Sequence, residues 1–176
     1  PLVLTKVGRS GAGARAAASH TGSLAGEDAV FDGIARQHGL VRARNEEHML
    51  DLVEVLVRCA LPAGSGIGII TQSGGAGVLM ADRAEELDLT VPPLAEATRR
   101  RLQPVIPGFG ALGNPVDVTA QFIADPSILR EAVIAVLDDP GVHVAIVWLQ
   151  LMDAYVEALA DIFGQIKAQA QKPFVV

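Results

Sequence analysis

The sequence predicts an α/β protein with a mostly parallel β-sheet flanked by helices. Short apolar runs rich in β-branched residues alternate with longer amphipathic segments along the 176 residues. Apolar residues make up 50% of the chain and charged residues only 19%, which is enough for a sizeable core and excludes a disordered chain. Strands that alternate with helices form βαβ units with right-handed crossovers, so we expect the strands to be parallel.

The first part of the chain predicts two strands and two helices. The expected elements are a strand over 2–7, a helix over 27–38, a brief strand at 40–41 and a helix from 46 to about 60. Gly39 ends the first of these helices, and Asn45 is placed as the N-cap of the second. The segment 9–26 consists of small and polar residues, which indicates a loop whose backbone a ligand can approach closely.

A break in this pattern at 61–66, rich in proline and glycine, indicates a boundary between domains 1–64 and 65–176. The elements expected after it are strands at 67–71, 90–91, 116–119 and 142–150, helices at 76–87, 96–103, 126–137 and 154–170, and a final strand near 174. The chain begins at Pro1 without a methionine and stops inside that final strand. We therefore interpret it as a piece of a larger protein.

Charge and cysteine content narrow the expected partners and location. Fourteen Lys and Arg against twenty Asp and Glu give a net charge of −6, which disfavours nucleic acid and anionic membranes as partners. No uninterrupted apolar run approaches the ~20 residues that span a bilayer. Cys59 is the single cysteine, so an internal disulfide and a cysteine-based metal cluster are excluded, and a cytoplasmic setting is the simplest interpretation. We expect Cys59 itself to lie in the core.

A glycine-rich loop over 71–77 follows the buried strand at 67–71 and precedes a helix. Backbone N–H groups at such a helix start, together with the helix dipole, can bind an anion. The spacing matches neither a P-loop nor the dinucleotide-binding fingerprint, so spacing alone favours a tight strand-to-helix turn over an anion site. The residues alone leave both interpretations open.

One of the four histidines stands apart from the others. His38 ends a helix, His48 lies in the first turn of the next helix, and His143 begins a strand, and each position has a structural explanation. His20 lies among small residues with no apolar pattern around it. A neutral imidazole in such a segment is a competent nucleophile near pH 7. The alternative is a structural role, in which the imidazole forms a hydrogen bond to the backbone and nothing more.

Several segments together resemble a known enzyme family. They are Gly8-Arg9-Ser10, the run from Ala12 to Gly26 with the sequence ASHTGSLAG at its end, 37–42, 70–79 and 114–119. Over most of its length the chain is thus similar to the NDP-forming acyl-CoA synthetases, the ADP-forming acetyl-CoA synthetases related to succinyl-CoA synthetase. The resemblance implies flavodoxin-like CoA-ligase domains of three layers, α/β/α, with the N-terminal part as the tail of a preceding CoA-ligase domain.

The resemblance also implies a reaction. In this family the histidine at the place of His20 is phosphorylated transiently by an acyl phosphate and passes the phosphoryl group to a nucleoside diphosphate. Gly22 would bind phosphate, and with Ser23 and Gly26 it would belong to a mobile loop that carries the group between two sites. The overall reaction joins an acid, CoA and ATP to give acyl-CoA, ADP and phosphate, and it runs in both directions.

The same resemblance assigns the glycine-rich loop. Family members hold the phosphohistidine between two helix N-termini, and Ser73, Gly74 and Gly75 match the second of them. The first would lie upstream of Pro1, as would the CoA-binding domain, and the ATP-grasp domain that binds nucleotide and Mg²⁺ is also outside this chain. We therefore expect no metal site here, other domains or subunits as partners, and an oligomer.

Alternatives remain at three places. Some relatives fuse this architecture to a protein acetyltransferase, where it senses acyl-CoA or nucleotide without turnover, but the retained His20 favours catalysis. A flavin binder of flavodoxin type is disfavoured because aromatics are only 4% of the chain. Asp117 either contributes to a ligand site at a strand end or caps a turn. Arg9 and Arg15 either bind a phosphate or are solvated. Arg99, Arg100 and Arg101 are expected to form a polar helix face. At the position of Asp88, relatives often have glycine.

Overall fold

The computed structural model describes residues 1–21 and 26–176, and these form two compact units, Pro1–Cys59 and Ala60–Val176. Each unit has its own parallel sheet, which confirms the predicted α/β class. Within the described residues no helix is both long and apolar enough to span a lipid bilayer.

The first unit contains a two-stranded parallel sheet and three helices. Its elements are β1 (Val3–Thr5), α1 (Gly11–Thr21), α2 (Asp28–Gln37), β2 (Val41–Ala43) and α3 (Glu46–Arg58). Gly39 follows α2 with a φ of 63°, and Asn45 caps α3 by accepting a hydrogen bond of 2.9 Å from the backbone of His48. Both helix boundaries therefore agree with the sequence, because glycine adopts left-handed φ without strain and an Asn side chain satisfies a free N–H group.

The segment 9–26 was expected to be a loop, and this expectation is wrong for residues 11–21, which form α1. The alanines at 12, 14, 16, 17 and 18 favour the helix more strongly than the glycines oppose it. Ser10 starts the helix, since its Oγ accepts from the Gly13 backbone N–H at 3.1 Å and its carbonyl accepts from Ala14 at 2.8 Å.

Ion pairs join α2 to both strands of the first unit. Asp28 accepts hydrogen bonds from Arg42 of β2 at 2.6 Å and from Lys6 after β1 at 3.2 Å, and Arg42 also contacts Asp32. The hydrogen bond from Arg42 is the main cause that lowers the pKa of Asp28, and the same bond raises the pKa of Arg42. The Arg42 guanidinium also lies 5.3 Å from the ring centre of Phe31.

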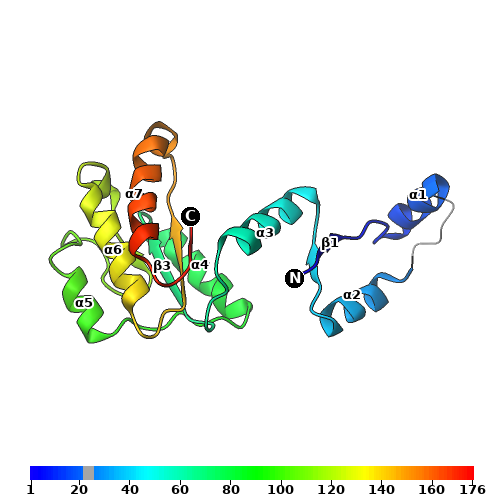
Figure 1. The fold of residues 1–176 in the computed structure, drawn as a ribbon, viewed down its shortest axis with the longest axis horizontal. Coiled ribbons are helices and arrows are strands. Elements are labelled where there is room, and N and C mark those ends of the chain that lie inside the picture. Colours follow the sequence, from blue (N-terminus) through cyan, green and yellow to red (C-terminus); the bar gives the residue numbers. More distant parts are fainter. Residues whose placement is uncertain (22–25) are drawn as a thin grey trace. The chain divides into compact units, whose positions relative to one another are not determined.

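The second unit is a four-stranded parallel sheet with the strand order β4-β3-β5-β6. Figure 1 shows β3 of this sheet among the helices of the unit. Its strands are β3 (Ile67–Thr71), β4 (Val116–Asp117), β5 (Val144–Trp148) and β6 (Phe174–Val175). Its helices are α4 (Gly74–Glu86), α5 (Glu96–Leu102), η1 (Ala120–Ile123), α6 (Pro126–Asp138), η2 (Asp153–Tyr155) and α7 (Val156–Gln169). In chain order this is a 2-1-3-4 arrangement, the order found in flavodoxin-like sheets.

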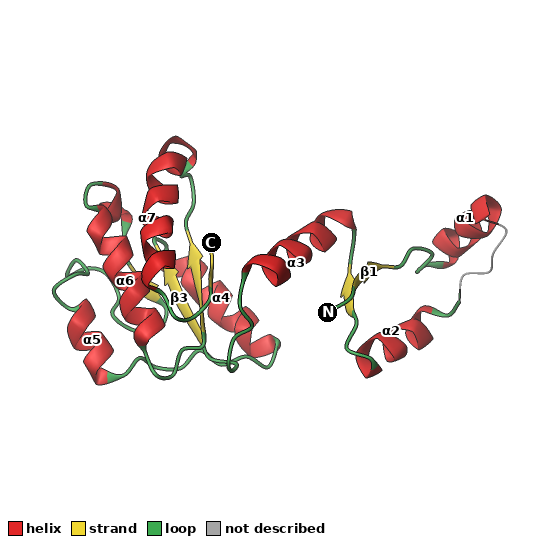
Figure 2. Cartoon of the chain, in the orientation of Figure 1, coloured by secondary structure: helices red, strands yellow, loops and turns green. Residues whose placement is uncertain are grey.

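Helices cover both faces of this sheet and give it the three layers that the resemblance implies (Figure 2). On one face Ile67 and Ile69 pack with Ala84 of α4. On the other face Ile70 packs with the buried residues of α6 and with Ile166 of α7. Gly68 lies on this second face, where a Cβ atom would collide with Val136 of α6, so glycine permits the close approach of helix and strand.

Three further expectations differ from the structure. The strand expected at 90–91 is reduced to an isolated parallel bridge between Thr90 and Gly66. The helix expected from Ala76 begins at Gly74, because the two glycines form its first turn rather than a loop before it. Cys59 is half-buried at the C-cap of α3 rather than in a core. No residue of α3 is buried, so its apolar stripe provides no core for Cys59 in the described residues.

Candidate functional site

The carboxyl ends of β3, β4 and β5 meet at one edge of the larger sheet. β3 is the first strand of the second unit, and it pairs with β4 on one side and β5 on the other. The connection that follows β3 leads to β4 and the one that follows β5 leads to β6, in opposite directions along the sheet, and open α/β sheets bind ligands at such a point. The loop from Gln72 to Ser73 and the start of α4 lie here.

The N-terminus of α4 has backbone donors without acceptors. Ser73 occupies the N-cap position, but its side chain makes no capping hydrogen bond. Within the described residues no hydrogen bond is formed by the backbone N–H groups of Gly74, Gly75 and Ala76, whereas Gly77 donates to the Ser73 carbonyl at 3.0 Å. Gly74 and Gly75 are exposed. Three free donors and the positive end of a 13-residue helix dipole thus face solvent, an arrangement suited to an anion.

Hydrogen bonds to Thr71 and Gln150 fix the shape of the turn between β3 and α4. Ser73 donates its backbone N–H to the Thr71 hydroxyl at 3.0 Å, and Thr71 is fully buried. Gln72 donates from Nε2 to the Gln150 carbonyl at 2.9 Å, so the loops after β3 and β5 are tied together. The buried Oε1 atom of Gln72 has no hydrogen-bond partner in the described residues. A Cβ on Gly77 would lie 3.0 Å from Pro115, which places the segment before β4 directly against α4.

Asn114 holds the segment before β4 in place. Its amide nitrogen donates to the carbonyls of Ile67 and Pro92 at 2.7 and 3.0 Å, and its oxygen accepts from the Ile69 backbone at 2.9 Å. One side chain therefore connects this segment to two positions of β3. The sequence analysis identified Asn114 only as part of a family motif. Hydrogen bonds between residues that are 45 positions apart leave no local pattern in the sequence.

Asp117 ends β4 and closes a turn, which decides in favour of turn capping as one of its roles. Its Oδ1 accepts from the Thr119 backbone N–H at 2.9 Å. Thr119 is buried with a φ of 57°, an unusual value for a β-branched residue, and its hydroxyl accepts from Gln121 at 3.2 Å. The other carboxylate oxygen, Oδ2, would lie 3.5 Å from a Cβ on Gly74.

His20 lies in the last turn of α1 and is exposed. The expectation that it stands clear of any core is therefore confirmed, although it is on a helix and not in a loop. Gly22 and Ser23, expected in the same mobile loop, lie outside the described residues.

The remaining histidines agree with the structural roles predicted for them. His143 Nδ1 accepts from the Gly66 backbone at 3.0 Å, and His48 Nδ1 accepts from the Arg44 backbone at 3.1 Å. His38 is the C-cap of α2. The three consecutive arginines of α5 are also a polar face as predicted, since Arg99 pairs with Glu96 at 2.6 Å and Arg101 with Asp138 at 2.7 Å.

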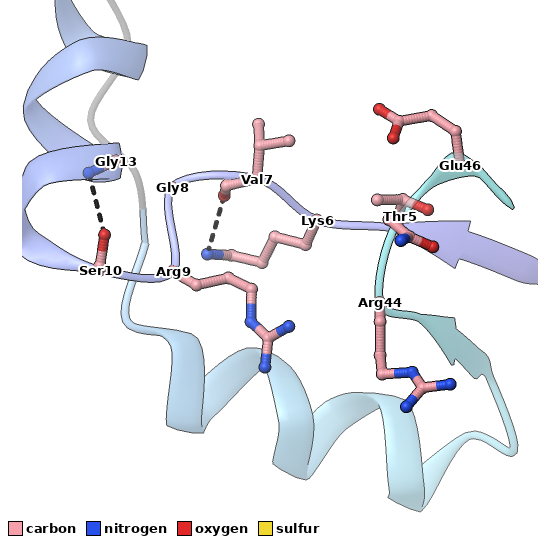
Figure 3. Close-up of a pocket in the computed structure, with 10 residues that line it drawn as sticks. Thr5, Lys6, Val7, Gly8, Arg9, Ser10, Gly13, Arg44 and Glu46 are labelled. Atoms are coloured by element: carbon pink, nitrogen blue, oxygen red, sulfur yellow. Dashed lines mark hydrogen bonds between the residues drawn. The ribbon is translucent and has the colours of Figure 1, made fainter. Parts of the chain in front are cut away.

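A cavity of about 320 Å³ opens at the carboxyl ends of β1 and β2 in the first unit (Figure 3). Lys6, Arg9 and Arg44 line it together with the start of α1. These charges are partly satisfied, because Lys6 pairs with Asp28, Arg9 Nε lies 3.7 Å from the same carboxylate, and Arg44 Nε donates to His48 at 3.3 Å. The sequence analysis did not identify Lys6 and Arg44 as candidate site residues. Their position at the carboxyl ends of parallel strands is the feature that distinguishes them.

Comparisons with known proteins agree with this architecture. A family model described as "Succinyl-CoA ligase like flavodoxin domain" matches residues 1–56. A second model, described as "Ligase-CoA domain", matches residues 67–176.

Similar proteins include the alpha subunit of ADP-forming acetate–CoA ligase I of Pyrococcus furiosus, which is 37% identical over 179 residues, covering 100% of this chain and 38% of that protein. ADP-forming 4-hydroxybutyrate–CoA ligase of Nitrosopumilus maritimus is 30% identical over 142 residues, covering 81% of this chain and 20% of that protein. The structure resembles that of dinucleotide-forming acetyl-coenzyme A synthetase 1 of Candidatus Korarchaeum cryptofilum in complex with phosphate and ADP, with a TM-score of 0.82 and 28% identity. The match to that structure covers 99% of this chain and 38% of that one, so the chain spans less than half the length of these relatives.

Proposed function

The chain belongs to the Ligase-CoA domain family, and from that premise we propose that it is part of an NDP-forming acyl-CoA synthetase. The complete enzyme joins a small carboxylic acid, CoA and ATP to give acyl-CoA, ADP and phosphate, and catalyses the reverse reaction. This chain contributes the phosphoryl-transfer centre. His20 is the nucleophile, and Ser73, Gly74 and Gly75 bind the phosphoryl group.

The observation that carries this proposal is the free N-terminus of α4. Three backbone N–H groups have no acceptor within the described residues, and the N-cap side chain does not use any of them. In a protein interior or a closed complex, such fixed donors stabilise negative charge without having to reorient. A phosphoryl group supplies the oxygen acceptors that these donors lack.

The chemistry at His20 follows from what an imidazole can do. A ring nitrogen attacks the phosphorus of the acyl phosphate, an N–P bond forms, and the bond from phosphorus to the acyl oxygen breaks. The carboxylate leaves with the electron pair of that bond, and the second ring nitrogen keeps its proton. In the next step a terminal oxygen of the nucleoside diphosphate attacks the same phosphorus, and the imidazole leaves.

The position of His20 also explains why a second site is needed. His20 lies in the last turn of α1, where the helix dipole is negative. A phosphoryl group at a helix C-terminus is repelled by the free carbonyls, whereas one at a helix N-terminus is attracted. The N-terminus of α4 offers the favourable environment that α1 does not.

CoA, nucleotide and Mg²⁺ are proposed to bind mainly outside this chain. In the described residues no group of three or more His, Cys, Asp or Glu side chains is arranged to hold a metal ion. We place the CoA-binding and ATP-grasp domains elsewhere on the same polypeptide or on a partner subunit, in a cytoplasmic oligomer. Residues 1–64 and 65–176 are the two domains that we assign to this chain. The comparisons lend no support to the regulatory alternative, since the relatives described above are ligases or synthetases.

Labelling of His20 tests the proposal. The complete enzyme, incubated with nucleoside triphosphate and Mg²⁺, is expected to carry a phosphate on His20 that acid releases and base does not. His20→Asn is expected to abolish the label and acyl-CoA synthesis, with little change in stability because the side chain is exposed. His38→Asn changes another exposed histidine at a helix end and serves as the control.

Mass spectrometry of peptides from the unmodified enzyme locates the label. A stable phosphate ester on Ser19 or Thr21, or full turnover by His20→Asn, would contradict the proposal. The second result would favour the sensing module instead.

A further inference from the structure

The cavity at the carboxyl ends of β1 and β2 is formed entirely by residues of the first unit. Three basic side chains line it, those of Lys6, Arg9 and Arg44 (Figure 3). Two of them belong to the turn 6–10 between β1 and α1, and the third follows β2. The parallel pairing of the two strands, with Thr5 opposite Ala43, brings these segments together.

The guanidinium groups of Arg9 and Arg44 keep most of their donors free. Arg9 Nε lies 3.7 Å from Asp28, and Arg44 Nε donates to His48 at 3.3 Å. Within the described residues no hydrogen bond is formed by the terminal Nη atoms of either arginine. In Figure 3 both guanidinium groups point to the same side, whereas the carboxylate of Glu46 points to the opposite side. Free guanidinium donors of this kind match the oxygens of a phosphate or carboxylate group.

The charges around the cavity do not cancel. Asp28 pairs with Lys6 and Arg9 at 3.2 and 3.7 Å, and Arg42 pairs with Asp28 at 2.6 Å and also with Asp32. The charged groups that line the cavity, together with these ion-pair partners, are the cations Lys6, Arg9, Arg42 and Arg44 and the carboxylates Asp28, Asp32 and Glu46. The cations outnumber the carboxylates, so positive charge is left over in a chain whose total charge is −6. An anionic ligand is attracted to this region.

The backbone of the turn 6–10 adds neutral donors. In the part of the chain that the structure describes, no hydrogen bond is donated by the backbone N–H groups of Gly8, Arg9 and Ser10, which all line the cavity. Gly8 has a φ of 74°, and successive N–H groups in such a turn can form a concave surface for an anion. Donors from two side chains and a turn suit the several oxygens of a phosphate group better than the two of a carboxylate. The volume of about 320 Å³ lies at the lower end of the range for small-molecule sites.

We propose that this cavity binds a phosphate group of a small molecule, held by Arg9, Arg44 and the backbone N–H groups of the turn 6–10. His20 lies at the other end of α1, about 14 Å away along the helix axis. A group bound in the cavity is thus out of reach of this imidazole, and the role of the cavity is binding rather than transfer. The site itself is independent of the function proposed above, but the choice of inorganic phosphate, ADP and CoA as sources of the phosphate group rests on that function.

Hydrogen exchange in the complete enzyme, followed by mass spectrometry, tests the proposal. Inorganic phosphate, ADP and CoA are titrated separately, and exchange with and without each compound is compared in the peptide that covers residues 7–14. At least one compound is expected to slow exchange of these amides about threefold or more, because N–H groups that donate to a ligand exchange less readily with water. The compound that gives half of the protection at the lowest concentration identifies the source of the phosphate group.

The double variant Arg9→Gln, Arg44→Gln removes both guanidinium groups. It is expected to raise the half-protecting concentration about tenfold, because charge-assisted hydrogen bonds to the ligand are lost. Arg36→Gln changes an exposed arginine of α2 outside the cavity lining, and as the matched control it should leave that concentration unchanged. If the double variant does not fold, each single variant gives the same measurement, with an expected increase of about threefold.

The outcomes separate this proposal from the proposed function. Absence of protection over 7–14 with all three compounds, or equal protection in the double variant, would overturn the phosphate site. Simultaneous loss of protection over 73–78 in the double variant would also overturn it, since the arginines would then act on ligand binding at α4. Labelling of His20 is measured on the same unmodified enzyme. Its absence would contradict the proposed function, whereas protection over 7–14 would still decide whether the cavity binds phosphate.

Discussion

Gly74 and Gly75 have open space where a side chain would stand. A Cβ on Gly75 would meet no atom within 4 Å, and one on Gly74 would make an ordinary contact with Asp117. Neither residue needs to be glycine for packing or for a positive φ. The space beside the free N–H groups is therefore open, and a side chain placed there would fill part of it.

Gly75→Val is expected to impair phosphoryl transfer more than folding. The free energy of unfolding should change by less than about 1 kcal/mol, because the position is exposed at a helix start. Phosphorylation of His20 in the complete enzyme should fall about tenfold or more, since the branched side chain shields backbone donors. Gly164→Val, at an exposed position of α7 where a Cβ also meets nothing within 4 Å, is the control. Equal phosphorylation by both variants would contradict the assignment of the anion site.

At the scale of elements, α2 is held to its sheet by charge more than by apolar packing. Ala35 is its one buried residue, whereas Val30 and Ile34 are 62% and 47% exposed. Asp28 in the first turn of α2 pairs with Lys6 and Arg42, which lie near β1 and on β2. The ion pairs that join α2 to the ends of β1 and to β2 thus depend on the ionised carboxylate of Asp28.

The stability of the first unit is expected to fall in acid because of Asp28. Its pKa is lowered from the ordinary value of 3.8, chiefly by the hydrogen bond from Arg42. A carboxyl group whose pKa is lower in the folded state stabilises that state fully above the unfolded pKa. The contribution is lost as the pH falls from about 4 through the folded pKa.

Circular dichroism during denaturant titrations at pH 3 to 6 would measure this loss. Asp28→Asn is expected to flatten the pH dependence over that range, while Asp51→Asn, at an exposed position of α3, leaves it as it is. An unchanged acid profile in Asp28→Asn would show that the ion pairs do not contribute.

At the scale of the whole molecule, the two units differ in how much core they contain. In the described residues the buried apolar side chains of the first unit are Ala35 and Ala43. The second unit buries large side chains completely, including Ile69, Leu129 and Ile166. Because apolar burial supplies most of the stability of a domain, the first unit should open at a much lower free energy.

Hydrogen exchange monitored by mass spectrometry would measure this difference. Amides of β3 and β5 are expected to exchange at least about a hundredfold more slowly than those of β1 and β2 in the isolated chain. In the complete enzyme the difference should shrink if other domains cover the first unit. Equal protection of the two sheets in the isolated chain would contradict the expectation.

The sequence by itself determined most of the elements. The strand Ile67–Thr71, the cap at Asn45 and the turn at Gly39 all lie where local patterns place them. Asp88, at a position where the resemblance implies glycine, indeed has a φ of 58°. These features are recoverable because caps, turns and strand runs depend on residues within a few positions of one another. The same local reasoning failed for α1, where alanine and glycine favour opposite states and their balance had to be weighed.

Only the tertiary structure decided how the site is assembled. The order β4-β3-β5-β6 brings Asp117 beside Gly74, and Asn114 connects to β3 across 45 residues. The sequence identified Ser73, Gly74, Gly75 and Asp117 as separate features, but it gave no reason to place the carboxylate next to the helix start. Nor could it tell whether the Ser73 side chain leaves the first N–H groups of α4 free. Strand order and the direction of a side chain depend on packing between distant segments, and for that reason they are properties of the folded chain rather than of any local pattern.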